Sequence, residues 1–410
     1  MAETKKLLSA SSLVESPFII LTIGEYTFGT YYGKKSVVSS YGNGVRVQYP
    51  NYMRSLNVIK INGTINTYTI NMEYQITLGN DPNFLEKVFS SVSNTRQIKI
   101  SYGDYNTPGF IYKEEEAIII RVTSNLDVVG SKISYIITAQ SNSLALQSNK
   151  FDFVRRVEKP TNVVREMFLN NKYNLSNIFY GMKQSALSQF IPSTDRAVEI
   201  EAQHSSTSLN YLNYLVSCML PIDNKDNVSS KYFLSIVDDI KNEYNGPYFK
   251  ITEIPTSIQS GVDLDSYEID VGYPTRNYIT NFSIDNNETW SILFDYSGAI
   301  KNQDYIYRID SNGRMKSELS PNITTSANYM KTTAQDKSWW SLVTSYPITA
   351  KLTLKGLIRP TMLMNYVKIN VLFYGQKHIA SGIYAITRQE DTIDRSGYRT
   401  TLSLMRVGKD

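Results

Sequence analysis

The chain has 410 residues, too many for one small core, which indicates roughly two to four domains. It carries 42 Lys and Arg against 38 Asp and Glu with no polybasic run, so the electrostatic footprint of a nucleic-acid grip is missing. The single cysteine, Cys218, excludes an intrachain disulfide. No apolar stretch is long enough for a membrane span or a signal peptide, so we expect a soluble protein outside the ordinary secretory route.

The first part of the chain is predicted to be a β-rich module. A polar tail over residues 1–16 is expected to be mobile. Short strands are predicted over Phe18–Ile23 and Tyr26–Tyr32. Two longer strands within Ser55–Leu78 flank Asn62-Gly63, which is a strong hairpin dipeptide.

A helix and further strands complete this module, which spans residues 17–147. Asp81 is expected to cap the helix and Pro82 to open it, with an apolar stripe between Phe84 and Val92. The strands that follow are predicted over Gln97–Gly103, Ala117–Val122 and Lys132–Ala139.

Residues 148–310 are predicted to form a middle α/β region. Thr161 or Asn162 is expected to cap its first helix, and a second helix is expected to begin around Thr207. Its strands are predicted over Lys231–Asp238, Phe249–Ile254, Ser266–Val271, Ile279–Ile284 and Trp290–Phe294.

A polar linker over residues 311–346 precedes a C-terminal β-module over residues 347–410. Ser311–Ser338 lacks apolar periodicity, which predicts a long loop or a segment that orders on assembly. In the module, strands are predicted over Ile348–Leu354, Tyr366–Tyr374 and Gly382–Arg388, and a return strand from Tyr398 after the polar segment Gln389–Gly397.

The two β-modules share an order of signals. In each, a strand, a Tyr-Gly pair, a loop, a glycine-led strand, a glycine-containing connection and a last strand follow one another. We therefore predict superposable modules over about residues 17–147 and 347–408, with convergent strand patterns as the open alternative. The fold class is α+β and β-rich, with two related small β-barrel-like modules flanking the middle α/β region.

No catalytic, cofactor-binding or metal-binding residue is assigned, and no cofactor is expected. The only imidazoles are His204, in a polar stretch, and His378, in a loop between strands. No Gly-x-Ser-x-Gly, His-Glu-x-x-His or Cys-x-x-Cys motif is present, and Cys218 is expected to be a buried small hydrophobe. Gly42-Asn43-Gly44 lacks the third glycine of a dinucleotide site and predicts a tight turn.

Three acidic clusters are expected to lie on the surface, because carboxylates at strand ends are usually solvated. They are Glu114-Glu115-Glu116, interpreted as a turn, Asp238-Asp239 at a strand end, and Asp263–Asp270. The last differs from a calcium loop because Glu268 stands where the tight-turn glycine belongs.

The segment Asn365–Val407 resembles the closing β-module of the central hub proteins of tailed-bacteriophage baseplates, the late-control-protein-D-like family. In that family a Gly-x-Tyr strand, an acidic turn and a Gly-Tyr-x-Thr strand start follow one another. Here these are Gly382–Tyr384, Glu390–Asp394 and Gly397–Thr400. The N-terminal module, with the strand Ile98–Asp104, looks like the family's first barrel, and the middle region looks like its inserted part.

The resemblance implies a structural virion protein that is not an enzyme. It would form a homotrimeric hub at the tail tip that adapts the six-fold tail tube to a three-fold spike. The partners implied are the tail tube protein, the central spike or needle, other baseplate proteins and the tape measure protein, with assembly in the host bacterial cytoplasm. The 31 tyrosines suit wet protein interfaces.

Two other functions stay open on the sequence. One is a tail-associated hydrolase of cell wall or glycan with a carboxylate pair in the middle region. The other is a tail module that binds host glycans through surface tyrosines and tryptophans.

Overall fold

The computed structural model describes most of the chain. The described residues are 17–31, 49–50, 52–77, 79–91, 96–104, 112–193, 195, 197–219, 231–254, 265–271, 279–286, 305–309, 315–319, 348–356, 363, 365–378 and 380–408. The predictions that lie outside these residues are the tail over 1–16, the turn Gly42–Gly44, the strand Trp290–Phe294 and, apart from residues 315–319, the polar linker over 311–346.

The N-terminal module is built from strands, as predicted, with one helix. The strands are β1 (Pro17–Ile23), β2 (Tyr26–Tyr31), β3 (Tyr49–Pro50), β4 (Met53–Ile61), β5 (Thr67–Gln75), β6 (Gln97–Asp104), β7 (Tyr112–Asp127) and β8 (Lys132–Ser141). The helix α1 (Phe84–Ser91) begins after Pro82, and the Asp81 carboxylate accepts a bond of 3.0 Å from the Asn83 backbone N–H. The predicted hairpin at Asn62-Gly63 is confirmed, because β4 and β5 are antiparallel neighbours.

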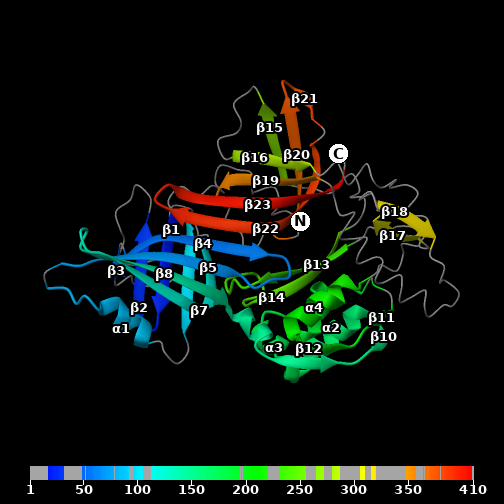
Figure 1. Ribbon diagram of the computed structural model, residues 1–410, viewed down its shortest axis with the longest axis horizontal. Helices are drawn as coiled ribbons and strands as arrows, with labels where there is room; N and C mark the ends of the chain where they lie inside the picture. Colours follow the sequence, from blue (N-terminus) through cyan, green and yellow to red (C-terminus); the bar gives the residue numbers. More distant parts are fainter. Residues whose placement is uncertain are drawn as a thin grey trace.

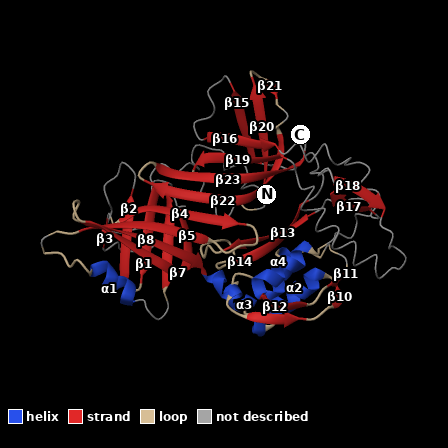
Figure 2. Cartoon of the chain, viewed as in Figure 1, coloured by secondary structure: helices blue, strands red, loops and turns tan. Residues whose placement is uncertain are grey.

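The middle region holds most of the helices (Figure 2). They are α2 (Pro160–Leu169), α3 (Leu175–Ile178) and α4 (Ser208–Ser217), with 3-10 turns over Asn171–Tyr173 and Gln184–Gln189 and a further one, Asn142–Gln147, just before the region. Its strands are β9 (Lys150–Phe153), β10 (Arg156–Glu158), β11 (Val198–Ile200), β12 (Gln203–Thr207), β13 (Lys231–Val237) and β14 (Tyr248–Ile254). α4 begins directly after Thr207, as predicted, and the Thr207 hydroxyl caps it by accepting from Asn210 N–H at 3.2 Å. The prediction that Thr161 or Asn162 caps the preceding helix is wrong, because Lys159 occupies the N-cap of α2.

The remaining strands include the C-terminal module. They are β15 (Asp265–Val271), β16 (Ile279–Asn286), β17 (Tyr305–Ile309), β18 (Met315–Leu319), β19 (Ile348–Lys355), β20 (Tyr366–Phe373), β21 (Gln376–Lys377), β22 (Gly382–Asp394) and β23 (Gly397–Gly408). The expected loop over Ser311–Ser338 is wrong in part, because β18 lies inside it and pairs with β17. The hairpin dipeptide Asn312-Gly313 between these strands is a signal for this pairing.

One continuous sheet joins the two β-modules (Figure 1). Its strand order is β16-β19-β23-β22-β4-β5-β8-β7-β6-β1-β2-β3, with β20 also paired to β22 and β15 parallel to β20. The strands assigned to the middle region at Ser266–Val271 and Ile279–Ile284 therefore pair with C-terminal strands instead. The acidic turn expected at Glu390–Asp394 is also wrong, since these residues continue β22 and several of them pair with β4.

The same strand order occurs twice in this sheet. The order β4-β5-β8-β7-β6 in the N-terminal module matches β16-β19-β23-β22-β20 in the C-terminal module, and every neighbouring pair in both is antiparallel. The matched segments of β7 and β22 read IIRVTSNLD from Ile119 and ITRQEDTID from Ile386. They share isoleucine, arginine and aspartate at the same positions.

Local irregularities repeat at equivalent places. β7 bulges at Ile120 against β8, and β22 bulges at Thr387 against β23. Just before each bulge, pairing with the preceding strand ends in the same backbone bond: Ile119 N–H donates to Arg96 O at 2.8 Å, and Ile386 N–H donates to Asn365 O at 3.1 Å. A second bulge also recurs, after the first residue of β4 and of β16. Because bulges are specific features of a strand pair, these coincidences indicate an internal duplication.

Candidate functional site: the repeat junction and the free sheet edges

The two repeats meet where β22 pairs with β4. The antiparallel register runs from Arg388 opposite Ile61 to Ile393 opposite Leu56. The apolar side chains of Leu56, Val58 and Ile393 are fully buried there. The junction is therefore a continuation of the core, not a loose contact between domains.

A buried ion pair lies beside this junction. Lys60 of β4 and Glu115 of β7 form a salt bridge in which both side chains are 0% exposed. The Glu115 carboxylate also accepts hydrogen bonds from the hydroxyls of Tyr68 and Tyr102. Burial by itself lowers the pKa of Lys60, but the adjacent Glu115 outweighs it, so the pKa of this lysine lies above its ordinary value.

A second ion pair connects the repeats directly. Lys113 Nζ of β7 lies 2.9 Å from Asp391 Oδ2 of β22. Asp391 also accepts from Gln389 Nε2 at 2.9 Å and from Thr400 Oγ1 at 2.7 Å. Burial lowers the pKa of Lys113, and the attraction of Asp391 offsets this only in part. These bonds satisfy the buried carboxylate from both repeats.

The middle region adds two aspartates to the same cluster. Asp238 accepts from Asn66 Nδ2 at 2.6 Å and from Ser143 Oγ at 3.3 Å. Asp239 accepts from the backbone N–H of Glu114 at 3.1 Å. Burial, and secondly the charge of Glu115, raises the pKa of Asp238 to about 6 and also raises the pKa of Asp239. One buried polar cluster thus joins both repeats to the middle region.

The prediction that these acidic clusters lie on the surface is wrong at four positions, because Glu114, Glu115, Asp238 and Asp239 are at most 6% exposed. The turn predicted at Glu114–Glu116 is also wrong, since these residues lie within β7. The four buried carboxylates are held by lysines, hydroxyls, amides and backbone N–H groups from distant parts of the chain. This arrangement suits a structural role, in which the cluster holds the two repeats and the middle region together. It does not suit catalysis on a polymer, because the carboxylates are buried and already bonded within the protein.

The other singled-out residues lie apart from the cluster. His204 is on β12 with an 83% exposed side chain, 3.6 Å from the Asp152 carboxylate. His378 follows β21, where its Nδ1 accepts from Ala380 N–H at 3.2 Å. Cys218 is buried at the end of α4, and burial raises the pKa of its thiol.

The acidic segment compared with a calcium loop is an extended strand where it is described. Asp265–Val271 forms β15 and pairs in parallel with β20. Within the described residues, no group of three or more His, Cys, Asp or Glu side chains is arranged to hold a metal ion. None of the described helices has the length and apolar character needed to cross a membrane.

The open sheet edges among the described strands include the distal half of β7 and the outer edge of β16. β6 pairs with β7 only as far as Ile118, so the distal half of β7 pairs with β8 alone. Along this edge Leu126 is 57% exposed. β16 pairs with β19 alone, and its Ile284 is 38% exposed.

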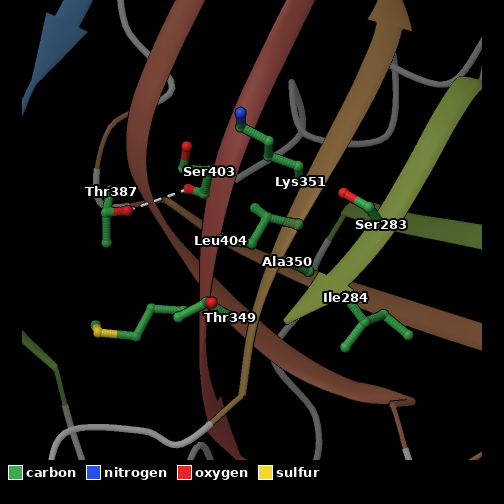
Figure 3. A pocket seen from close by; sticks show the side chains of 9 residues that line it. Ser283, Ile284, Thr349, Ala350, Lys351, Thr387, Ser403 and Leu404 are labelled. Atoms are coloured by element: carbon green, nitrogen blue, oxygen red, sulfur yellow. Dashed lines mark hydrogen bonds between the residues drawn. The ribbon is translucent and has the colours of Figure 1, made fainter. Parts of the chain in front are cut away.

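A groove adjoins the open edge of β16. Its volume is about 440 Å³, and Ser283 and Ile284 of β16 line it together with residues of β19, β22 and β23. Figure 3 shows these two side chains at the border of the groove, and Thr387 across from them donating to Ser403 O at 3.2 Å. The open edge therefore continues into a partly polar depression.

The chain is similar to solved structures of tail proteins. The tail protein from Neisseria meningitidis is 8% identical, with a TM-score of 0.50 over 95% of this chain and 96% of that one. A 43 kDa prophage tail protein from Shewanella oneidensis is 10% identical, with a TM-score of 0.49 over 95% of this chain and 98% of that one. An Escherichia coli type VI secretion component, described as similar to T4 bacteriophage tail proteins, is 9% identical, with a TM-score of 0.46 over 88% and 75% of the two chains.

No family model matches the chain, and no curated protein matches it. The comparison therefore rests on solved structures. Of the three described, the Neisseria protein, with its TM-score of 0.50, supports a conclusion about the fold. The chain has a β-rich α+β fold like that of the Neisseria tail protein.

Proposed function

We propose that this protein is the central hub of a phage baseplate, a homotrimer that adapts the six-fold tail tube to a three-fold spike. The observation that carries the proposal is the internal repeat, in which strand order, two bulges and one backbone hydrogen bond recur in the same register. Three chains with two such repeats each present six similar modules. A six-module ring matches a six-fold tube while its chains keep three-fold symmetry for the spike.

The buried cluster supports this structural role. A ring of duplicated modules transmits load only if the two modules of one chain keep a fixed relation. The β22–β4 pairing and the Lys113–Asp391 ion pair fix that relation within the chain. The proposed partners are the tail tube protein, the spike or needle, other baseplate proteins and the tape measure protein, and the protein resides in the virion after assembly in the host cytoplasm.

We propose no enzymatic activity. The middle-region carboxylates Asp238 and Asp239, which a glycan hydrolase would need in a cleft, are buried and hydrogen-bonded. Incubation of bacterial cell walls with the purified protein is expected to leave their turbidity unchanged. A loss of turbidity that Asp238→Asn abolishes would support the hydrolase instead.

Glycan binding by an aromatic platform also lacks support in the groove of the middle region. The groove of about 300 Å³ there is lined by Phe153 and Tyr211. Their rings stack on each other with centroids 3.5 Å apart, and both side chains are buried. A sugar ring needs an exposed aromatic face, which these two residues do not offer.

The proposal is tested by a reconstruction of the whole particle. We expect the chain in three copies on the tail axis, between the end of the tube and the spike. Density for this chain away from the axis, or in a different copy number, would reject the hub assignment.

A further inference from the structure

The internal repeat assigns a counterpart to each strand of the junction between the repeats. β22, which forms the junction from one side, corresponds to β7, and β4, which forms it from the other side, corresponds to β16. Within the chain, β22 pairs with β4. Among the described strands, the edges of β7 and β16 that correspond to this junction have no strand opposite them.

Side-chain burial differs between the junction and its counterparts. Ile393 of β22 and Val58 of β4 are 0% exposed, whereas their counterparts Leu126 of β7 and Ile284 of β16 are 57% and 38% exposed. Leu126 lies opposite the core residue Ile133 of β8, so it extends the apolar face of the sheet to its edge. The apolar face is present on both open edges, but nothing within the described chain covers it.

We propose that β7 of one copy of this chain pairs, antiparallel, with β16 of a second copy, in the register of the internal β22–β4 junction. The internal register places Ile393 opposite Leu56 and Thr392 opposite Asn57. Carried over through the repeat, it places Leu126 opposite Phe282 of the second copy and Asn125 opposite Ser283 of the second copy. Each chain contributes one edge of each kind, so the contact is head-to-tail and closes into a ring when the rotation permits.

Open strand edges with apolar faces favour pairing with a second copy of the chain. An unpaired edge presents a row of backbone donors and acceptors that another strand satisfies. Phe282 is partly buried against the core of the C-terminal repeat, while Leu126 extends the core of the N-terminal repeat. Pairing the two edges would join these cores, as the internal junction already does through Ile393 and Tyr398, which pack in the N-terminal core.

Charge separates the two kinds of junction. The internal junction buries Asp391 of β22 beside Lys113. At the counterpart of Asp391, β7 carries Ser124, which needs no counterion. If β22 paired wrongly with β16 of another copy, Asp391 would face the apolar Ile284 at a desolvation cost. The ionic junction between β22 and β4 therefore forms within one chain, and the apolar edges of β7 and β16 associate between copies.

Paired cysteines test the register. In the internal junction, Thr392 Oγ1 and Asn57 Oδ1 lie 3.4 Å apart, so their counterparts Asn125 and Ser283 are suited to a disulfide between copies. The full-length variant Asn125→Cys/Ser283→Cys, oxidised at high protein concentration, is expected to give intermolecular disulfides. Each single variant, and Asn125→Cys/Asn281→Cys with its register shifted by two residues, is expected to give none, because diagonal neighbours lie about 7–8 Å apart. Cys218 is buried and stays in all variants.

A charge at the edge tests the apolar contact. Leu126→Lys is expected to weaken self-association about tenfold or more in sedimentation experiments, because a lysine would be buried at the contact. Val129→Lys is the matched control, since Val129 is 97% exposed in the same hairpin but beyond the proposed register. It is expected to leave association unchanged.

The results of these experiments distinguish the edge pairing from the hub proposal, on which the expected number of copies rests. Disulfides that close at three chains support both. Disulfides in the expected register that run on into open polymers support the edge pairing and count against the trimeric hub. A trimer that forms without these disulfides, a chain that stays monomeric at every concentration, or equal effects of the two lysine variants would overturn the edge pairing.

Discussion

Lys60 and Glu115 form an ion pair that lies wholly inside the protein, although one residue is on β4 and the other on β7. The two strands are not neighbours in the sheet, because β5 and β8 lie between them, so the direct contact is made by the side chains. The hydroxyls of Tyr68 and Tyr102 complete the shell around the carboxylate. The energy of this contact therefore depends on all its members being present together.

Removal of the lysine is expected to destabilise the fold strongly. Lys60→Met would leave the Glu115 carboxylate buried without its cation, at a cost of about 3–5 kcal/mol in the free energy of unfolding. Lys60→Met combined with Glu115→Gln is expected to recover part of this loss, since no charge is then stranded. Urea unfolding of the three proteins measures both effects.

An exposed ion pair supplies the control. Lys87 and Asp81 lie 2.5 Å apart with side chains 69% and 40% exposed. Lys87→Met is expected to change the free energy of unfolding far less than Lys60→Met does, because solvent screens the exposed pair. A loss for Lys60→Met no larger than that for Lys87→Met would contradict a role for the buried pair in stability.

The raised pKa of Asp238 predicts that the stability of the fold depends on pH. Its pKa is about 6 in the folded protein against an ordinary value of 3.8, mainly because it is buried. A carboxyl with a raised folded pKa costs nothing while both states are protonated, and it lowers stability progressively as pH rises from about 4 through 6. The full loss corresponds to about 3 kcal/mol.

The variant Asp238→Asn removes this titration. Its free energy of unfolding, relative to the wild-type chain, is expected to rise by up to about 3 kcal/mol between pH 4 and pH 7. Any constant offset from altered bonds to Asn66 and Ser143 cancels in this comparison of two pH values. Unfolding curves that stay parallel across this range would show that Asp238 does not titrate as described.

The strands could be predicted from the sequence because their signal is local. In β19, for example, Ala350, Leu352 and Leu354 are buried while Lys351 between them is exposed, as the alternation predicts. The hairpin of β4 and β5 followed from Asn62-Gly63 for the same reason. The shared order of strand and glycine signals predicted two related modules, and the strand order does occur twice.

The junction could not be predicted because its partners are remote in sequence. The pairing of β22 with β4 has no local signal, and polar residues at Gln389–Asp394 resemble a turn when considered alone. The sequence does hold a weak signal, which is the position of Lys60 in the alternating pattern of its strand. Lys60 alternates in step with Leu56 and Val58, so in a strand it must share their buried face.

The turn between β4 and β5 is expected to be sensitive to a single methyl group. Gly63 has φ of 66°, and its carbonyl accepts from Asn213 Nδ2 of α4 at 2.7 Å. A Cβ there would lie 2.3 Å from Asn213 Oδ1. Gly63→Ala therefore has to displace the amide that attaches this turn to the middle region, in addition to the strain of a left-handed conformation.

Gly24 separates these two costs, because it has a φ of 58° and a Cβ added there would have nothing within 4 Å. Gly24→Ala is expected to cost about 1 kcal/mol in the free energy of unfolding from backbone strain alone. Gly63→Ala is expected to cost about 1 kcal/mol more through the lost hydrogen bond. In an Asn213→Ala background, where that bond is already missing, Gly63→Ala should cost no more than Gly24→Ala. An undiminished excess in that background would mean that the contact with Asn213 is not the cause.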